Sequence, residues 1–306
     1  MARTRFAPDT GLTVRMTAVM FLLGALLVAI VVSLMYVAGS SQLAVIIGLA
    51  GIAVAFFQWW MSDTLAMRAM RAREVSPQDA PELHGMIDRL CEMADMPKPR
   101  VAIADTNLPN AFATGRSPKR AVVCVTTGIL HTLTAEELEG VIAHELSHVA
   151  HRDVLVMTVA STAGIVAGMV TRGAQWGTLG LGRARSSNDS NGAIGFFVVL
   201  IVSLISYAIS FLLLRLLSRY RELCADRSGA YLTQKPSALA SALRKISGQM
   251  NAVPERDLRA AQSMNAFFIT PAVRGLTLST LTSTHPPLEE RLDQLAKISA
   301  SLGQSQ

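Results

Sequence analysis

A long stretch without charge constrains this chain more than any other feature. No charged residue occurs from Met16 to Ser62, and a small polar break, Gly39–Gln42, divides the stretch into two halves. Each half is close to the roughly 20 apolar residues that one membrane-spanning helix needs. A cleaved signal peptide would have an apolar core of only about 7–15 residues, so we do not expect one. The sequence therefore predicts a transmembrane hairpin at residues 16–62.

Basic residues flank this hairpin on both sides. The arginines that precede and follow it are Arg3, Arg5, Arg15, Arg68, Arg71 and Arg73. Because basic loops stay on the cytoplasmic side, both ends are predicted to lie in the cytoplasm. Trp59 and Trp60 stand where an aromatic belt at the membrane interface would be.

Two further apolar stretches occur later in the chain. Residues 154–171 form a borderline span of 18 residues, residues 193–214 form a stronger one, and a Gly-, Ser- and Asn-rich loop lies between them. They either cross the bilayer twice or pack as a hairpin on the remainder of the protein. The charges of their flanks do not decide between these alternatives.

The overall composition agrees with a membrane protein that carries a water-facing part. Only 16% of the 306 residues are charged, whereas a soluble domain has about 25%. The net charge of +6 suits an anionic membrane surface. The basic residues flank apolar segments and form no separate face, so we expect no nucleic-acid partner. Three cysteines without paired spacing favour a reducing compartment, hence a cytoplasm-facing protein.

Residues 74–153 have the patterns of a mixed domain. Apolar residues from Leu83 to Cys91 recur at helical spacing. Arg100–Ala104, Asn110–Thr114 and Ala121–Val125 are predicted strands, which gives a sheet of about three strands. An open edge of that sheet could accept an extended peptide as an added strand. Further helices are predicted from Pro236, with Leu239, Leu243 and Ile246 on one side, and from Leu288.

The strongest chemical motif is His144-Glu145-Leu146-Ser147-His148. Thr134 and Glu137 have capping-box spacing just ahead of it, so the motif is expected inside a helix. Four residues advance about 400° around a helix, which places both imidazoles on one face. They can then hold one zinc ion, with Glu145 as general base. The alternative is an ordinary helix with two surface histidines, but the apolar flanks indicate a buried helix.

The third metal ligand has to come from another part of the chain. His151 lies about 10 Å along the helix axis from His144, too far for one ion with metal–nitrogen bonds of about 2 Å. Glu222 and Asp226 follow the last apolar stretch at i, i+4 spacing. Glu222 would complete a two-histidine, one-carboxylate site, and Asp226 would accept the second ring N–H of a ligating histidine. Cys224 lies on the opposite helix face and is not expected to be a ligand.

Taken together, these motifs make the chain resemble the HtpX-type heat-shock metalloproteases, which are related to the CAAX prenyl protease 1 family. The matching features span nearly the whole chain in the family's order: the early apolar hairpin, Pro109–Ala113, Glu137–His148 with Asp153, the second apolar hairpin, Ser218–Asp226, and Thr284–Pro287 with Arg291. Leu223 departs from the aromatic residue usual in the family, which changes packing and leaves the chemistry undisturbed.

The resemblance implies a fold of the α+β class that is predominantly helical. It would comprise a zincin-like (gluzincin) catalytic domain with a small three-stranded sheet, and membrane-spanning helical hairpins. We divide the chain into a cytoplasmic tail (1–15), the first hairpin (16–62), a first catalytic part (63–153), the second apolar hairpin (154–214) and a second catalytic part (215–306).

The function that the resemblance implies is zinc-dependent endopeptidase activity in the bacterial inner membrane, with the active site facing the cytoplasm. Misfolded or damaged membrane proteins would be the substrates, as part of a stress response, and the Asn110 region would belong to the substrate cleft. One Zn²⁺ per chain would be held by His144, His148 and Glu222. Glu145 would take a proton from the attacking water and pass it to the leaving amine, and His285 is a candidate donor to the oxyanion.

Three other functions fit the sequence less well. A CAAX-type prenyl-protein endopeptidase would need a membrane-enclosed cavity, for which four apolar stretches are few. A zinc transporter or sensor would place ligands inside the spanning helices, yet the apolar stretches contain no His, Asp or Glu. An inactive scaffold would not need Glu145. A homo-oligomer is possible, and the sequence gives no sign of it.

Overall fold

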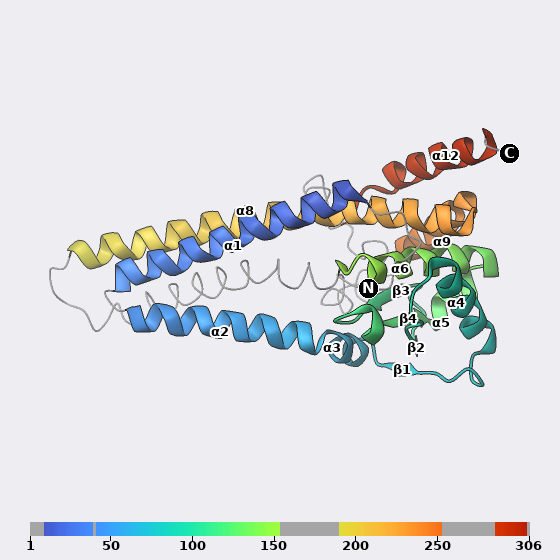
Figure 1. Cartoon of the computed structure of the whole chain (residues 1–306), viewed down its shortest axis with the longest axis horizontal. Helices are drawn as coiled ribbons and strands as arrows, with labels where there is room; N and C mark the ends of the chain where they lie inside the picture. Colours follow the sequence, from blue (N-terminus) through green and yellow to red (C-terminus); the bar gives the residue numbers. More distant parts are fainter. Residues whose placement is uncertain (1–8, 39–40, 154–189, 253–284, 305–306) are drawn as a thin grey trace. The chain divides into compact units, whose positions relative to one another are not determined.

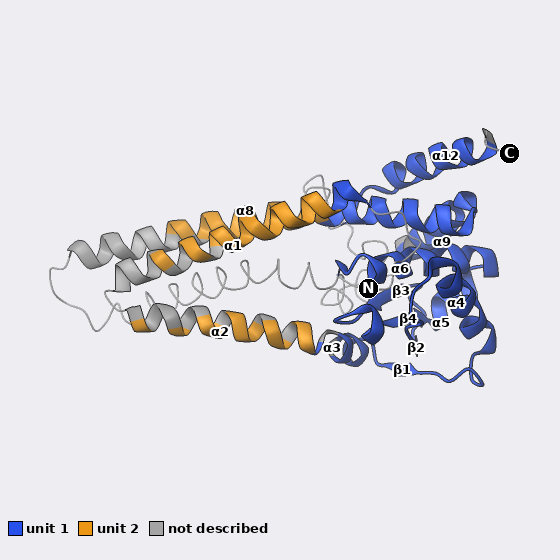
Figure 2. Cartoon of the chain, viewed as in Figure 1, with its two compact units in different colours: residues 1–12, 61–155, 218–306 blue, residues 13–60, 156–217 orange. Residues whose placement is uncertain are grey.

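The computed structural model describes residues 9–38, 41–153, 190–252 and 285–304 (Figure 1). The chain divides into two compact units, shown in Figure 2. Unit 1 comprises Met1–Leu12, Met61–Leu155 and Ser218–Gln306, and unit 2 comprises Thr13–Trp60 and Val156–Leu217. The apolar stretch predicted at residues 154–171 lies outside the described residues.

Unit 2 consists of long helices in its described part. They are α1 (Thr10–Ala38), α2 (Ser41–Trp60) and the first part of α8 (Ser190–Thr233), which contains the apolar stretch predicted at 193–214. No helix in the described ranges is both long enough and apolar enough to qualify as a membrane span. Helix α8 has 44 residues and continues from unit 2 into unit 1. One helix therefore connects the apolar stretch to the segment that carries Glu222.

Unit 1 contains a four-stranded mixed sheet in the order β1-β2-β4-β3. Its strands are β1 (Ala72–Glu74), β2 (Arg100–Ala104), β3 (Ala111–Thr114) and β4 (Val122–Thr126). Strands β2 and β4 are parallel, whereas β1–β2 and β3–β4 are antiparallel. Strand β3 is an edge strand, and it packs against helix α6 (Ala135–Ala150).

The prediction of three strands was wrong by one. Strands β2, β3 and β4 lie within a residue of their predicted bounds, and β1 was missed. Strand β1 has only three residues, Ala-Arg-Glu, and two of them are exposed. Such a segment has too few residues to show a period-2 apolar pattern, and its pairing with β2 depends on tertiary contacts.

The remaining helices of unit 1 pack around this sheet and around α6. They are α3 (Ser62–Ala69), α4 (Pro81–Ala94), α5 (Thr127–Thr132), α9 (Pro236–Ala252) and α12 (Leu288–Gln304), together with the 3-10 turn Pro118–Arg120. The apolar residues predicted to line one side of α9, namely Leu239, Leu243 and Ile246, are fully buried. Their burial against α6 and α12 forms much of the core of unit 1.

Helix α6 begins as its sequence predicts. The Thr134 hydroxyl accepts from the Glu137 N–H, and the Glu137 carboxylate accepts from the Thr134 N–H at 2.9 Å. Glu137 also accepts from Ser241 at 2.6 Å and from Lys245 at 2.7 Å, both on α9. Although burial raises the pKa of Glu137, the bonds from Lys245, Ser241 and Thr134 outweigh it and lower the pKa to about 2. This carboxylate therefore fixes both the start of α6 and its contact with α9.

Candidate metal centre

Helix α6 presents its two motif histidines on one buried face. His144 is 1% exposed and His148 is 7% exposed. Their rings cross at 88°, and their Nε2 atoms are 3.3 Å apart. Two ring nitrogens at this distance inside a core need a common partner, because a buried polar atom is costly to leave unsatisfied. The α6 histidines therefore form one half of a cation site.

Glu222 on α8 supplies the other half. Its Oε2 lies 3.6 Å from His144 Nε2, and its Oε1 lies 3.5 Å from His148 Nε2. Tetrahedral ligands with bonds of about 2.0–2.1 Å stand about 3.4 Å from one another. Among the residues that the structure describes, His144, His148 and Glu222 form a buried group with its ligand atoms within 4.8 Å of each other. The three residues fit a single zinc-sized ion.

The close approach of α8 to α6 depends on a glycine. A Cβ on Gly229 would lie 2.9 Å from the backbone nitrogen of His144, closer than real contacts allow. Gly229 follows Glu222 by seven residues, two turns along the same face of α8. No pattern in the sequence singled out Gly229. The only hint was a glycine one turn after Asp226. It indicates a close helix contact only once the helix that packs against it is known.

Each ligating histidine is oriented through its Nδ1 atom by a buried carboxylate. Asp226 Oδ1 lies 2.9 Å from His144 Nδ1, in the position predicted for it. Arg291 on α12 holds Asp226 through two hydrogen bonds of 2.7 Å. Burial raises the pKa of Asp226, but the Arg291 charge outweighs it and keeps the pKa below its usual value. An ionised Asp226 at this distance favours the tautomer of His144 with the proton on Nδ1, which leaves Nε2 free to bind a metal.

His148 has a matching partner that we did not predict. Its Nδ1 lies 2.7 Å from Asp153 Oδ2, and that oxygen lies 2.9 Å from Arg221 Nε. The opposing effects of burial and of Arg221 leave the pKa of Asp153 lowered. Asp153 belongs to the motif that resembles the family, but the motif does not show which residue Asp153 contacts. The turn that ends α6 brings its carboxylate back to the ring.

Glu145 lies between this centre and the edge strand. It is buried, and burial raises its pKa above the usual value. The Ala113 N–H on β3 donates to Glu145 Oε2 at 2.9 Å. A carboxylate held in this way, with a raised proton affinity, is suited to take and release a proton.

The other predicted positions are placed as follows. His285 Nδ1 lies 3.1 Å from Glu222 Oε2, so this ring borders the centre. Although the buried Glu222 is desolvated, His285 and the ligand histidines hold its pKa well below the usual value. Asn110 is fully buried, immediately before β3. His151 ends α6 and bonds through Nδ1 to Ser147 O at 2.8 Å.

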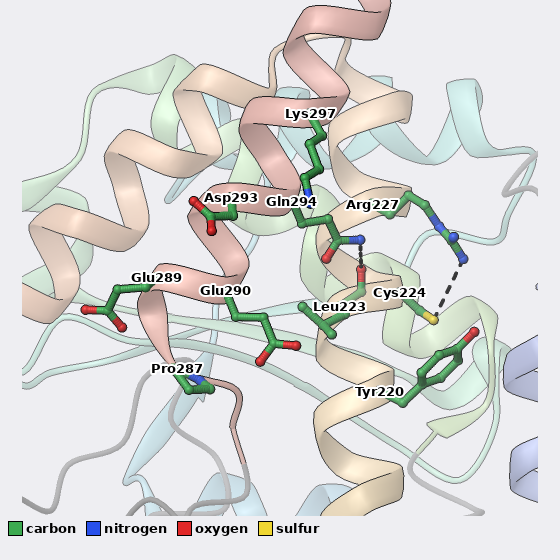
Figure 3. A pocket seen from close by; sticks show the side chains of 10 residues that line it. All are labelled: Tyr220, Leu223, Cys224, Arg227, Pro287, Glu289, Glu290, Asp293, Gln294 and Lys297. Carbon is green, nitrogen blue, oxygen red and sulfur yellow. Dashed lines mark hydrogen bonds between the residues drawn. The ribbon is translucent and has the colours of Figure 1, made fainter.

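Cys224 lies on the other side of α8, as its helical position predicted. It lines a cavity of about 590 Å³ between α8 and α12, shown in Figure 3. Its thiol donates to Asp9 Oδ2 at 3.0 Å, and the side-chain amide of Gln294 donates to the Leu223 carbonyl at 3.0 Å. One face of α8 therefore contributes Glu222 to the metal centre, and the opposite face lines this cavity.

Comparison with known proteins identifies the fold around this centre. The family model described as peptidase family M48 matches residues 77–299, which include both histidines, Glu145 and Glu222. The chain belongs to peptidase family M48. It is therefore a metallopeptidase, and the predicted resemblance to HtpX-type proteases is confirmed.

The M48 relatives are similar over nearly their whole length. "Protease HtpX homolog 1" of Streptomyces coelicolor is 52% identical over 99% of this chain and 98% of its own. "Protease HtpX homolog" of Moorella thermoacetica is 46% identical over 97% of both chains. The crystal structure of S. mikatae Ste24p has the same fold, with a TM-score of 0.53 at 18% identity, covering 89% of this chain and 62% of that one.

Proposed function

We propose that this M48 metallopeptidase is a zinc-dependent endopeptidase integrated in the bacterial inner membrane. In this proposal it cleaves misfolded or damaged membrane proteins, and other unfolded polypeptides, in a stress response. The observation that carries the zinc assignment is the convergence of two imidazoles and one carboxylate. The Nε2 atoms of His144 and His148 are 3.3 Å apart, and the two oxygens of Glu222 lie 3.6 Å from the first and 3.5 Å from the second. Two imidazoles and one carboxylate are the donors of many catalytic zinc sites, in which a fourth position stays open.

The residues around this position have distinct roles in hydrolysis. When bound, zinc supplies a Lewis acid that polarises the scissile carbonyl and makes water a nucleophile at neutral pH. Glu145 takes a proton from the attacking water and later hands it to the leaving amine. His285, in contact with Glu222, donates to the developing oxyanion. Asp226 and Asp153 hold the two ligand rings in the tautomer that exposes Nε2.

The edge strand β3 can hold the substrate in extended form. Thr126 N–H donates to Asn110 O at 2.9 Å, so Asn110 faces β4. Backbone N–H and C=O groups point to alternate sides along an antiparallel strand. Those of Ala111 and Ala113 therefore point away from β4, toward the open edge of the sheet. The Glu145 carboxylate accepts a hydrogen bond from the Ala113 N–H, so the proposed catalytic carboxylate lies directly at this edge. A peptide added to β3 would run past Glu145 and the metal ligands, which supports a zincin-like (gluzincin) arrangement.

The membrane location is supported by the surfaces of the long helices. Large apolar side chains are more than half exposed along α1, α2 and α8, among them Phe21, Val28, Ile46, Leu49, Phe57, Ile201 and Leu212. Large exposed apolar surfaces mark contacts with a partner or a membrane. The arginines that flank the first hairpin support a cytoplasmic location of its ends and of the active site.

The decisive experiment compares cleavage of casein by detergent-purified protein with and without a zinc chelator. The Glu145→Gln variant should bind zinc and lose about 10²–10⁴-fold in rate. Glu136→Gln, on the exposed first turn of the same helix, is the matched control and should cleave normally. A Glu145→Gln protein that holds zinc and still cleaves casein would refute the assignment of the base.

The topology has its own test. Single cysteines placed at residues 183–192 should react only with reagent added from outside the cell if the second apolar hairpin crosses the membrane twice. Reaction from the cytoplasmic side would show that this hairpin does not cross.

A further inference from the structure

A second cavity of unit 1 has no part in the catalytic site. It has a volume of about 440 Å³ and lies at the junction of α3, β1 and β2. Arg68, Arg71 and Arg100 line it, together with Asp63 and Glu74. We propose that this cavity binds the phosphate group of an anionic phospholipid headgroup. The proposal rests on the membrane location given above, and its chemistry is distinct from proteolysis.

The two acidic residues of the cavity both form ion pairs with Arg100. Arg100 reaches Glu74 with one terminal nitrogen and Asp63 with the other, each at 2.5 Å. This arginine thereby joins the first turn of α3, the end of β1 and the start of β2. Arg100 balances one of the two carboxylate charges, and with Arg68 and Arg71 the side chains that line the cavity carry a net charge of +1.

Arg68 and Arg71 supply the charge that remains. Both are exposed, and neither side chain forms an ion pair with any residue in the described ranges. The Arg71 N–H donates to the Arg68 carbonyl at 3.1 Å, which places both side chains on the same turn. Two guanidinium groups beside a cavity offer several N–H donors, the preferred partners of phosphate oxygens.

The backbone at Arg71 gives a second indication. Its φ is +49°, in the left-handed region where glycine and asparagine are favoured. An arginine in this conformation costs about 1 kcal/mol relative to a residue that adopts it freely. A turn that needed only its shape would be better served by glycine. We infer that the side chain at this position has a use, and binding an anion is the use that its surroundings allow.

The sequence position of the cavity indicates a lipid as the source of the phosphate. Helix α2 ends with Phe56, Trp59 and Trp60, whose rings lie 5.7–6.3 Å apart, and such clusters mark a membrane interface. Asp63 lines the cavity only three residues after Trp60, at most about 11 Å of chain. Lipid phosphates lie in the headgroup layer just outside the hydrocarbon core.

The test is native mass spectrometry of the full-length protein in neutral detergent. Phosphatidylglycerol is titrated in, with phosphatidylcholine in a parallel series. Arg68→Gln and Arg71→Gln should each weaken phosphatidylglycerol binding about fivefold, the effect of one arginine near an anionic surface. Arg73→Gln is the matched control, because Arg73 is also exposed, lies in β1 between the lining residues Ala72 and Glu74, and does not line the cavity. Its affinity should stay within twofold of that of the wild type.

Equal losses in all three variants would reduce the effect to general surface charge and overturn the proposal, as would no loss in any. Thermal unfolding of each variant checks that folding is unchanged. A further series replaces the lipid with inorganic phosphate or glycerol 3-phosphate. If either saturates the site and phosphatidylglycerol does not displace it, the ligand is a soluble phosphate and the lipid assignment is wrong. Casein cleavage in the same detergent tests the proteolytic function separately, since it depends on Glu145 and not on these arginines.

Discussion

Replacing Gly229 with alanine should weaken metal binding although it changes none of the ligands. The new Cβ would meet three backbone atoms of α6: His144 N at 2.9 Å, His144 Cα at 3.2 Å and Ala143 C at 3.3 Å. Backbone atoms inside a helix cannot swing aside as the end of a side chain can. The strain therefore has to be relieved by moving α8 away from α6.

The size of the movement follows from the contact distances. Ordinary contacts begin near 3.4 Å, so the helices must separate by about 0.5 Å at this level. Zinc–ligand distances tolerate deviations of only about 0.2 Å. Because Glu222 lies on the same face of α8, we expect zinc affinity to fall by about 10–100-fold, as it does when the support of a ligand is lost. Overpacking should also cost about 1–3 kcal/mol of stability.

Two other glycines serve as controls for this variant. Gly85 on α4 has nothing within 4 Å of its Cβ position, so Gly85→Ala should leave zinc affinity unchanged and stabilise by up to about 1 kcal/mol. Gly140 on α6 would meet Leu239 of α9 at 3.3 Å, so Gly140→Ala should affect stability without separating α6 from α8.

Zinc affinity is measured by competition with a chromophoric chelator, and stability by thermal unfolding of the metal-free protein. A Gly229→Ala protein with zinc affinity within twofold of that of Gly85→Ala would show that the contact with His144 does not set the ligand geometry.

Three further predictions follow from other contacts. Asp153→Asn should lower zinc affinity about 10–100-fold, because the amide cannot hold the ring of His148 as a carboxylate does; unchanged affinity by chelator competition would exclude this role. Glu137 has a lowered pKa of about 2, so its contribution to stability should be complete above about pH 4.5 and vanish as the pH falls toward 2. The unfolding free energies of wild type and Glu137→Gln should therefore differ at pH 7 and converge in acid, and a constant difference would contradict this. Burial raises the pKa of the Cys224 thiol to about 12, so iodoacetamide at pH 8 should modify it only after unfolding; rapid modification of the native protein would contradict its burial.

Local signals in the sequence predicted the elements of unit 1 closely. The spacing of Thr134 and Glu137 fixed the start of α6, because a capping box involves only residues three apart. The apolar periodicity around Leu239 predicted α9 and its buried face. The same reasoning failed at β1, since a three-residue edge strand has no pattern of its own and exists through its pairing with β2.

The candidate site divides in the same way. Helical geometry alone placed His144 beside His148 and put Cys224 on the far side of α8. It also gave Asp226 its role next to Glu222, since i and i+4 share a face. The contacts of Asp153, Arg221 and Arg291 were not predictable, because each joins segments that are distant in sequence or separated by a turn. Sequence spacing gives the direction of a side chain along its own helix and does not give the neighbour that it meets.

The sequence by itself determined the chemistry of this protein: two histidines and a glutamate on one helix, a carboxylate pair on another, and apolar segments between them. Residue type and helical periodicity suffice for these, because they depend on neighbours within about one turn. Only the tertiary structure decided that α8 approaches α6 so closely at Gly229 that no Cβ fits between them. This approach brings the Glu222 carboxylate to 3.5 Å from Nε2 of His148. That distance is set by packing between helices, and packing depends on the side chains of both partners at once.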